Sequence, residues 1–201
     1  MSKVLLGVTG GIAAYKACEL TRLLVKDGHE VVPLLTPGAE RFVRAETFLA
    51  LARRPPAEDV YPHLTRADAD VVVMAAAPAD YRPAAARTDK RPKDTSTWTV
   101  ELEPTTDILQ TLGDRRRDGQ VLVGFAADAG ETGLERARDK LMRKQANLIV
   151  FNDVSRDDVG FDTPENEVVL VTAAGERTVT KAPKAEIAAA ILDEVERILH
   201  G

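Results

Sequence analysis

The residues best suited to chemistry lie in VVVMAAAPADYRPAAARTDKRPK, residues 71–93. A continuous apolar run is followed by one carboxylate, Asp80, and ten residues later by a basic cluster that contains Lys90 and Lys93. Asp80 is suited to hold Mg²⁺ or a ligand hydroxyl, and Lys90 is suited to close over a triphosphate as a point charge. A polar loop of this kind, taken alone, is more often a solvated surface segment, so its function depends on what lies beside it.

The turn in GVTGGIAAYK, residues 7–16, is a second candidate. Gly10 and Gly11 would let the backbone approach a phosphate, and the free N–H groups of a helix N-terminus favour an anion. The spacing matches neither G-x-G-x-x-G nor a P-loop. A tight strand–helix turn that needs glycine only for its geometry explains the pattern equally well, so both alternatives stay open.

Two lysines four residues apart, Lys140 and Lys144, share one face of a predicted helix. Neighbouring ammonium groups repel each other, and an anion bound between them would relieve the repulsion. A charged solvent face is the alternative. The preceding strand ends in GFAAD, residues 124–128, on the side where ligands bind, and the lysines would have to reach back to that side along the helix.

The apolar pattern indicates how these residues are positioned. Continuous apolar strands are predicted at 4–8, 31–35, 71–77, 121–126 and 148–151, an alternating edge strand at 98–102, and a hairpin at 167–172 and 177–180. Helices are predicted at 12–26, 39–43, 46–53, 107–112, 134–144 and 184–199. The alternation predicts a Rossmann-like three-layer α/β/α fold with a mostly parallel sheet and a C-terminal hairpin.

Ligands of such sheets bind at the carboxyl ends of the strands. That edge would collect the glycine turn, Asp80, and the FND segment at 151–153. Asn152 there either contacts a ligand or caps a turn. His63, in a linker, is as well explained by a surface position as by catalysis. No Ser/His/Asp arrangement and no metal-ligand cluster stands out from the sequence.

Composition excludes several classes of protein. The chain has 201 residues, which suits a single domain over 1–201, and a net charge of −5, which argues against a nucleic acid partner. One cysteine excludes an internal disulfide framework. No apolar run is long enough to span a bilayer and MSKVLLG has no signal-peptide pattern, so we expect a cytoplasmic protein without a membrane partner.

Most of the chain resembles a known family. The segments VVVMAAAPADYRP, KRPK, TTDIL, VGFAAD, ARDKLMRKQANLIVFNDV and GFDTPENEVVLV resemble the nucleotide-binding part of phosphopantothenate–cysteine ligase, over about residues 70–199. The resemblance implies an enzyme of coenzyme A biosynthesis that uses CTP and Mg²⁺ to activate 4′-phosphopantothenate as an acyl-cytidylate and then couples it to cysteine. It also implies a homodimer. The family's asparagine-bearing catalytic segment has no counterpart in this sequence.

The resemblance also assigns residues. Asp80 and Lys90 are the catalytic candidates, with Asp80 as the metal ligand and Lys90 stabilising charge that develops at the α-phosphate. The predicted nucleotide-binding residues are Ala76, Asp80, Phe125, Lys140, Lys144 and Asn152.

The first part of the chain resembles a different family. LLGVTGGIAAYKACELTRLL and TPGAERFVRAETFLAL are similar to the flavin-binding phosphopantothenoylcysteine decarboxylase, which implies that Gly10, Gly11 and Thr36 hold FMN. Residues 1–69 would then be a flavoprotein-like half and 70–201 a ligase-like half of one domain. A ligase is the leading hypothesis, an FMN-binding flavoprotein the second, and a non-catalytic nucleotide-binding protein the third.

Overall fold

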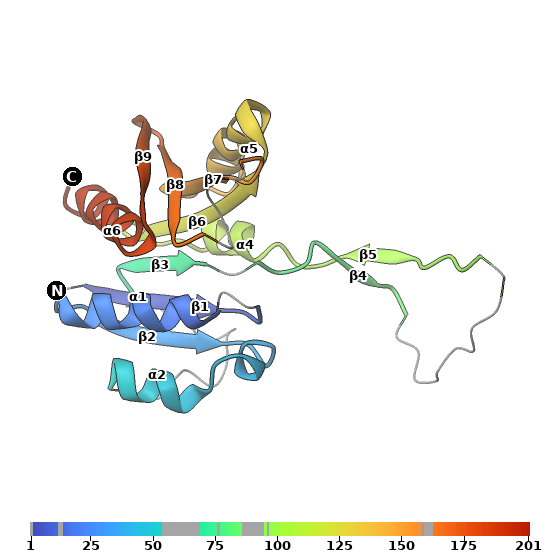
Figure 1. Cartoon of the computed structure of the whole chain (residues 1–201), viewed down its shortest axis with the longest axis horizontal. Helices are drawn as coiled ribbons and strands as arrows, with labels where there is room; N and C mark the ends of the chain where they lie inside the picture. The colour runs from blue at the N-terminus through green and yellow to red at the C-terminus, as the bar shows by residue number, and fades with distance from the viewer. Residues whose placement is uncertain are drawn as a thin grey trace.

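The computed structural model describes residues 2–11, 14–53, 69–75, 77–85, 95, 97–156, 158 and 163–201. Within these ranges the chain forms a seven-stranded sheet in the order β2-β1-β3-β6-β7-β8-β9 and a two-stranded sheet of β4 and β5 (Figure 1). The strands are β1 Lys3–Val8, β2 Glu30–Leu35, β3 Val71–Met74, β4 Tyr81–Pro83, β5 Leu102–Pro104, β6 Val121–Asp128, β7 Leu148–Asp153, β8 Glu165–Thr172 and β9 Gly175–Pro183. The helices are α1 Ala14–Lys26, the 3-10 turn η1 Ala39–Arg41, α2 Ala45–Ala52, α4 Ile108–Asp114, α5 Gly130–Arg143 and α6 Lys184–His200.

The large sheet is covered on both faces, as the apolar strands predicted. β2, β1, β3, β6 and β7 pair in parallel, and β8 and β9 continue the sheet as an antiparallel hairpin. Leu6 belongs to the core shared with α1, α2 and α6, whereas its neighbour Leu5 belongs to the core shared with α4 and α5. Successive side chains of a strand point to opposite faces, so a strand buried on both faces must be apolar throughout. The three-layer α/β/α fold and the C-terminal hairpin are therefore confirmed.

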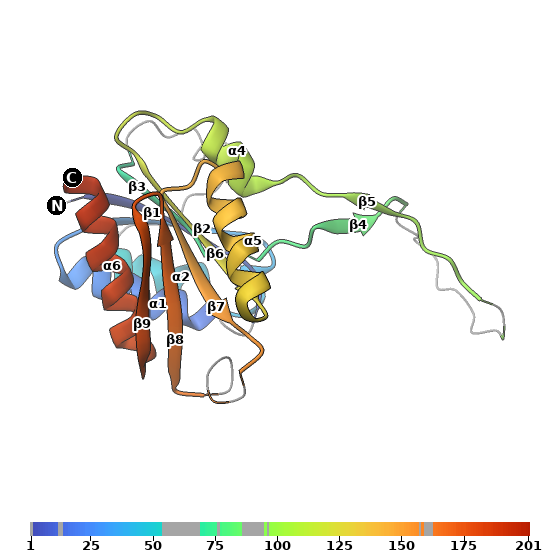
Figure 2. The same cartoon turned by 90° about the horizontal axis from the view of Figure 1, so that it is seen from above.

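The predicted edge strand at 98–102 is wrong in position and in partner. Strand pairing begins only at Leu102, and β5 pairs antiparallel with β4 rather than with the large sheet. The two strands form an arm that extends away from the body of the molecule (Figures 1 and 2). The alternating sequence indicated a strand with one apolar face, but it contained no information about which strand it would pair with.

Several boundaries also differ from the predicted ones. β3 ends at Met74 instead of residue 77, and β6 continues to Asp128, where it still pairs with Asp153 of β7. The predicted helix at 39–43 is only the three-residue turn η1. Helix α5 starts at Gly130, four residues before the predicted start, and Gly130, with a φ of +58°, donates its N–H to Asp153 at 3.0 Å.

The parallel strands bring several predicted site segments to one edge. The register pairs Gly7 of β1 with Met74 of β3, and Met74 with Gly124 of β6. Beyond these strands, the N–H of Ala77 donates to Oγ1 of Thr9 at 3.3 Å, so the glycine turn touches the segment that leads to Asp80. In the described part of the chain, no helix has the length and apolar character needed to cross a membrane.

Candidate functional site

Lys140 reaches from α5 to the strand that precedes it. Its Nζ donates to the main-chain carbonyl of Phe125, in β6, at 2.8 Å. Helix α5 runs back across the sheet after β6, and this contact shows that the long lysine side chain spans the return. The prediction that the lysines would have to reach back toward the ligand side is met for Lys140.

Lys144, one turn later, reaches a different partner. It is the C-cap of α5, and its Nζ donates to Oδ2 of Asp107. The Lys144 side chain is only 12% exposed, while that of Asp107 is 50% exposed. Asp107 is also the N-cap of α4, because its Oδ1 accepts the N–H of Gln110 at 2.9 Å. The ion pair therefore joins the end of α5 to the start of α4.

Asp80 lies at the base of the arm, next to the same helix start. Its carbonyl accepts the N–H of Thr105 at 2.9 Å, and the Thr105 hydroxyl donates to the carbonyl of Ala79 at 2.5 Å. These bonds tie the segment after β3 to the segment before α4. We call Asp80, Asp107, Lys140 and Lys144 the lysine cluster.

The electrostatics show that the four groups of the lysine cluster influence one another. Burial lowers the pKa of Lys140, the charges of Lys144 and Arg143 act in the same direction, and the carboxylates of Asp107 and Asp80 oppose it. Burial acts to raise the pKa of Asp107, but the hydrogen bonds from Lys144 and Gln110 and the charges of both lysines lower it overall. Two cationic and two anionic groups thus share one small region.

Such a region can hold an anion together with a hard cation. Among the described residues, no group of three or more His, Cys, Asp or Glu side chains could enclose a metal ion. Mg²⁺ does not require one, since it is commonly held by one or two carboxylates together with the phosphates of a nucleotide and water. Asp80 fits that role through its carboxylate, and the lysines fit phosphate oxygens as charge-assisted donors.

The glycine turn has a structural explanation for one of its two glycines. A Cβ on Gly10 would lie 2.6 Å from the carbonyl oxygen of Gly38, whereas a Cβ on Gly11 would meet no atom within 4 Å. Thr36 is also engaged, since its Oγ1 accepts the N–H of Ala39 at 3.2 Å and so caps η1. Gly10 and Thr36 are therefore accounted for by local packing, while Gly11 faces open space.

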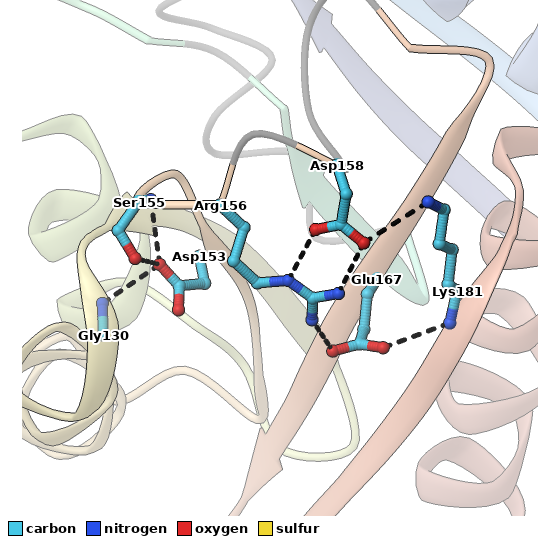
Figure 3. A network of polar contacts seen from close by, with 7 residues as sticks. All are labelled: Gly130, Asp153, Ser155, Arg156, Asp158, Glu167 and Lys181. Atoms are coloured by element: carbon cyan, nitrogen blue, oxygen red, sulfur yellow. Dashed lines mark hydrogen bonds and ion pairs between the residues drawn. The ribbon is translucent and has the colours of Figure 1, made fainter.

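At the end of β7, the structure explains the role of Asp153 but not that of Asn152. Asp153 accepts three hydrogen bonds, from the N–H of Gly130 at 3.0 Å and from the N–H and hydroxyl of Ser155 at 2.9 and 2.6 Å, so it caps a turn (Figure 3). Asn152 pairs with Ala127 of β6, and its buried Oδ1 has no partner among the described residues. A ligand role for Asn152 stays a prediction. Ala76, Lys90, Lys93 and His63 lie outside the described residues.

Sequence reasoning missed Asp107 as part of the site. The sequence indicated a helix that begins at Asp107, and Asp107 is its N-cap, but a cap uses one carboxylate oxygen and the other contacts Lys144. A hollow of about 410 Å³ at the opposite edge of the sheet, lined by Arg116, Arg117 and Gln145 among others, contains none of the predicted site residues. The lysine cluster therefore lies apart from this hollow.

Comparisons with known proteins place this chain in a family. Residues 22–199 match the family model described as the DNA/pantothenate metabolism flavoprotein C-terminal domain. The match begins inside the part of the chain that resembled a flavoprotein, and the division into two halves at residue 69 stays a prediction. A coenzyme A biosynthesis bifunctional protein CoaBC from Bacillus subtilis is 36% identical over 127 residues, which are 63% of this chain and 31% of that protein.

A second CoaBC, from Mycobacterium tuberculosis strain H37Rv, is 46% identical over 96 residues, 43% of this chain and 23% of that protein. The chain spans about a third of the length of the first curated relatives it matches.

Solved structures agree over nearly the whole chain. The C-terminal domain of a CoaBC superposes with a TM-score of 0.66 and 26% identity, covering 99% of this chain and 96% of that one. A DNA/pantothenate metabolism flavoprotein from Streptococcus pneumoniae, at 17% identity, shares the fold with a TM-score of 0.68, covering 98% of this chain and 99% of that one. The chain therefore belongs to the family of DNA/pantothenate metabolism flavoprotein C-terminal domains.

Proposed function

We propose that this chain binds CTP with Mg²⁺ at the lysine cluster and acts as the nucleotide-activating part of a phosphopantothenate–cysteine ligase in coenzyme A biosynthesis. The single observation that carries the proposal is that Lys144 contacts Asp107 at the base of the arm, while Lys140, one turn earlier, is near enough to Asp107 and Asp80 for both carboxylates to act on its pKa. Membership of the family, whose relatives include CoaBC proteins, supports the same function.

The proposed reaction has two steps. The carboxylate of 4′-phosphopantothenate attacks the α-phosphorus of CTP, pyrophosphate leaves, and an acyl-cytidylate forms. The amine of cysteine then attacks the acyl carbon and CMP leaves. Both steps build or move negative charge on phosphate oxygens, and fixed cationic donors aimed at that charge are the largest source of rate in such reactions.

Different residues of the chain would have different roles in these two steps. Asp80 would hold Mg²⁺ against the phosphates, Lys140 would donate to a phosphate oxygen, and Lys90, as the resemblance implies, would stabilise charge at the α-phosphate. The Phe125 side chain is partly buried against the core beneath α1 and α6, and its carbonyl fixes Lys140. Phe125 would contact the nucleotide through the part of its ring that the core leaves exposed.

Equilibrium binding and turnover test this proposal separately. Titration calorimetry with CTP and Mg²⁺ should show binding that weakens by roughly ten- to 150-fold in Lys140→Ala, because a charge-assisted hydrogen bond contributes about 1.5–3 kcal/mol. Lys26 is an exposed lysine in the last turn of α1, so Lys26→Ala is the matched control and should bind CTP normally. Absence of CTP binding by the wild-type chain would reject the proposal.

Pyrophosphate release then distinguishes an enzyme from a binding protein. The chain is incubated with 4′-phosphopantothenate, cysteine, CTP and Mg²⁺, and pyrophosphate is measured over time. Release that requires 4′-phosphopantothenate, CTP and Mg²⁺, and that continues beyond one equivalent per chain only when cysteine is present, supports the ligase. CTP binding without release would favour the non-catalytic nucleotide-binding alternative.

FMN binding is the second candidate, and Gly11 is the observation that favours it. The open space at Gly11, beside the contact between Thr9 and Ala77, would admit a phosphate group next to the backbone. Added FMN should then bind with quenching of its fluorescence. Unchanged fluorescence at protein concentrations far above that of FMN would remove this candidate.

A further inference from the structure

The hollow of about 410 Å³ lies at the edge of the sheet where β6 and β7 begin. Its lining includes Val121, the first residue of β6, and Asn147, which directly precedes β7. The other walls come from the end of α4, the turn that follows it and the last turn of α6. Pockets that hold small molecules in proteins commonly have volumes of about 300–1,000 Å³, so the hollow is large enough for a ligand.

The lining of the hollow is mainly polar. Among its described lining residues, seven carry a polar or charged side chain, and the apolar ones are Val121, Ile198 and Leu199. An apolar ligand would leave most of these polar groups without hydrogen-bond partners, which costs free energy. The hollow is therefore suited to a polar ligand, and its charged side chains decide which kind.

Arg116 is a half-buried cation of the lining that no carboxylate neutralises. Its Nη1 donates to the amide oxygen of Asn147, which also accepts the N–H of Leu122 at 2.9 Å. Within the described ranges, the Arg116 guanidinium forms no ion pair. A guanidinium has several N–H donors in one plane, so Arg116 can bind an acceptor in the hollow and keep its bond to Asn147.

Arg117 adds a second guanidinium to the lining, and one of its donors is buried without a partner. Its Nη2 donates to the carbonyl of Ala69 at 2.9 Å and to Oδ1 of Asp70 at 3.1 Å. Its Nε is buried and has no hydrogen-bond partner among the described residues. A buried N–H without an acceptor is unfavourable, and a bound oxyanion would supply the acceptor.

The two carboxylates of the lining do not neutralise these guanidinium groups. Oδ1 of Asp114 accepts the side-chain amides of Gln110 and Gln145, at 2.9 and 3.1 Å. Asp118 is exposed, and in the part of the chain that the structure describes it forms no ion pair. Planar guanidinium groups pair with carboxylate and phosphate oxygens through two parallel hydrogen bonds, so an anion is the ligand that the hollow fits best.

We propose that the hollow is a second ligand site, which binds a small polar anion through the guanidinium groups of Arg116 and Arg117. The group that they recognise is a carboxylate or a phosphate. The site is separate from the lysine cluster, because α4 lies between Asp107 at its start and Asp114 at its end, and a helix of this length spans about 10 Å. This inference goes beyond the proposed function and does not depend on it.

NMR of the ¹⁵N-labelled chain tests the site directly. Succinate, as the carboxylate probe, or inorganic phosphate is added to about 20 mM, with sodium chloride of equal ionic strength as the reference. For at least one of the two anions, saturable shifts are expected for the amides of Gly119, Gln120 and Gln145 and for the Nε–H of Arg117. No saturable shift with either anion, or shifts confined to the lysine cluster, would overturn the inference.

Three consecutive arginines supply the matched variants. Arg116→Met should weaken binding of the anion at least about tenfold, and Arg116→Lys should weaken it severalfold, because an ammonium group keeps the charge but lacks the planar pair of donors. Arg115→Met should bind within about twofold of wild type, since Arg115 is exposed and is not among the residues that line the hollow. Equal losses for Arg115→Met and Arg116→Met would contradict the assignment, because they would indicate a general attraction to the basic turn.

Two further measurements keep the test decisive. If Arg116→Met does not fold, the loss in Arg116→Lys and the shifts in the wild-type spectra carry the result. Anion binding that persists in saturating CTP and Mg²⁺ supports a separate site, whereas displacement by CTP would overturn it. Failure of the chain to bind CTP would reject the proposed function and leave the expected shifts at the hollow unchanged.

Discussion

At the scale of single residues, the structure explains glycine at only one of the two adjacent positions in the turn after β1. Gly10 is pressed against the backbone of Gly38, where a Cβ would approach the carbonyl carbon to 2.7 Å. Neither Gly10 nor Gly11 takes a positive φ, so the backbone conformation does not require glycine at either position. Space alone distinguishes them, and it leaves Gly11 as the position at which a ligand could approach the chain.

Alanine substitution should separate the two glycines. Gly10→Ala is expected to lower the free energy of unfolding by about 1–3 kcal/mol, since the methyl group forces backbone apart. Gly11→Ala should change it by no more than about 0.5 kcal/mol. Urea denaturation measures both, and equal losses for the two variants would contradict the packing explanation.

At the scale of elements, an ion-pair network joins the segment after β7 to the hairpin of β8 and β9 (Figure 3). Arg156 donates to both oxygens of Asp158, each at 2.9 Å, and also to Glu167 of β8. Lys181 of β9 lies 3.3 Å from Asp158 and donates its N–H to Glu167 at 3.2 Å. Basic and acidic side chains from three segments of the chain therefore alternate at the edge of the sheet.

This network should appear in the pH dependence of stability. The hydrogen bond from Arg156 is the main reason that the pKa of Asp158 falls to about 2, from its usual 3.8. A folded-state pKa below the unfolded one gives stability that is present above about pH 4 and is lost as the pH falls toward 2. Asp158→Asn should flatten this part of the profile, and the difference should shrink in high salt because the group is exposed.

Urea denaturation between pH 5 and pH 2.5, at low and at high ionic strength, provides the measurement. Asp118→Asn, a carboxylate on the turn before β6, is a control for the general effect of removing one negative charge. Identical slopes for wild type and Asp158→Asn would mean that the network contributes nothing in solution.

The arm is the second informative element. Tyr81 pairs with Pro104 and Pro83 with Leu102, which gives the ribbon an apolar face, while the pair of Arg82 and Glu103, 2.7 Å apart, lies on the other. Tyr81 and Leu102 are 60% and 58% exposed. An isolated two-stranded ribbon is marginally stable in water, and an exposed apolar face commonly marks an interaction site.

At the scale of the whole molecule, we propose that the homodimer implied by the family resemblance uses this apolar face of the arm. An uncharged apolar face can pack against its own copy across a two-fold axis. Leu102→Glu should then convert a dimer to a monomer in sedimentation velocity, whereas Leu49→Glu, an equally apolar and 45% exposed position on α2, should leave it unchanged. A wild-type monomer at high concentration would contradict the proposal.

The sequence predicted the layers and the parallel sheet because those features follow from local apolar patterns. Lys140 and Lys144 were predicted to share a helix face, and they do, yet their partners Phe125 and Asp107 lie 15 and 37 residues away. Such contacts depend on how α4 and α5 pack, which no local pattern records. The same reason explains why the pairing of β5 with β4 was missed.

A crystal structure of the chain with CTP and Mg²⁺ would show directly whether the lysine cluster binds the nucleotide. Phosphate density is expected against Nζ of Lys140, with Mg²⁺ near the Asp80 carboxylate, at the carboxyl ends of β3 and β6. Nucleotide density elsewhere, for example in the hollow lined by Arg116 and Arg117 at the opposite edge of the sheet, would contradict it.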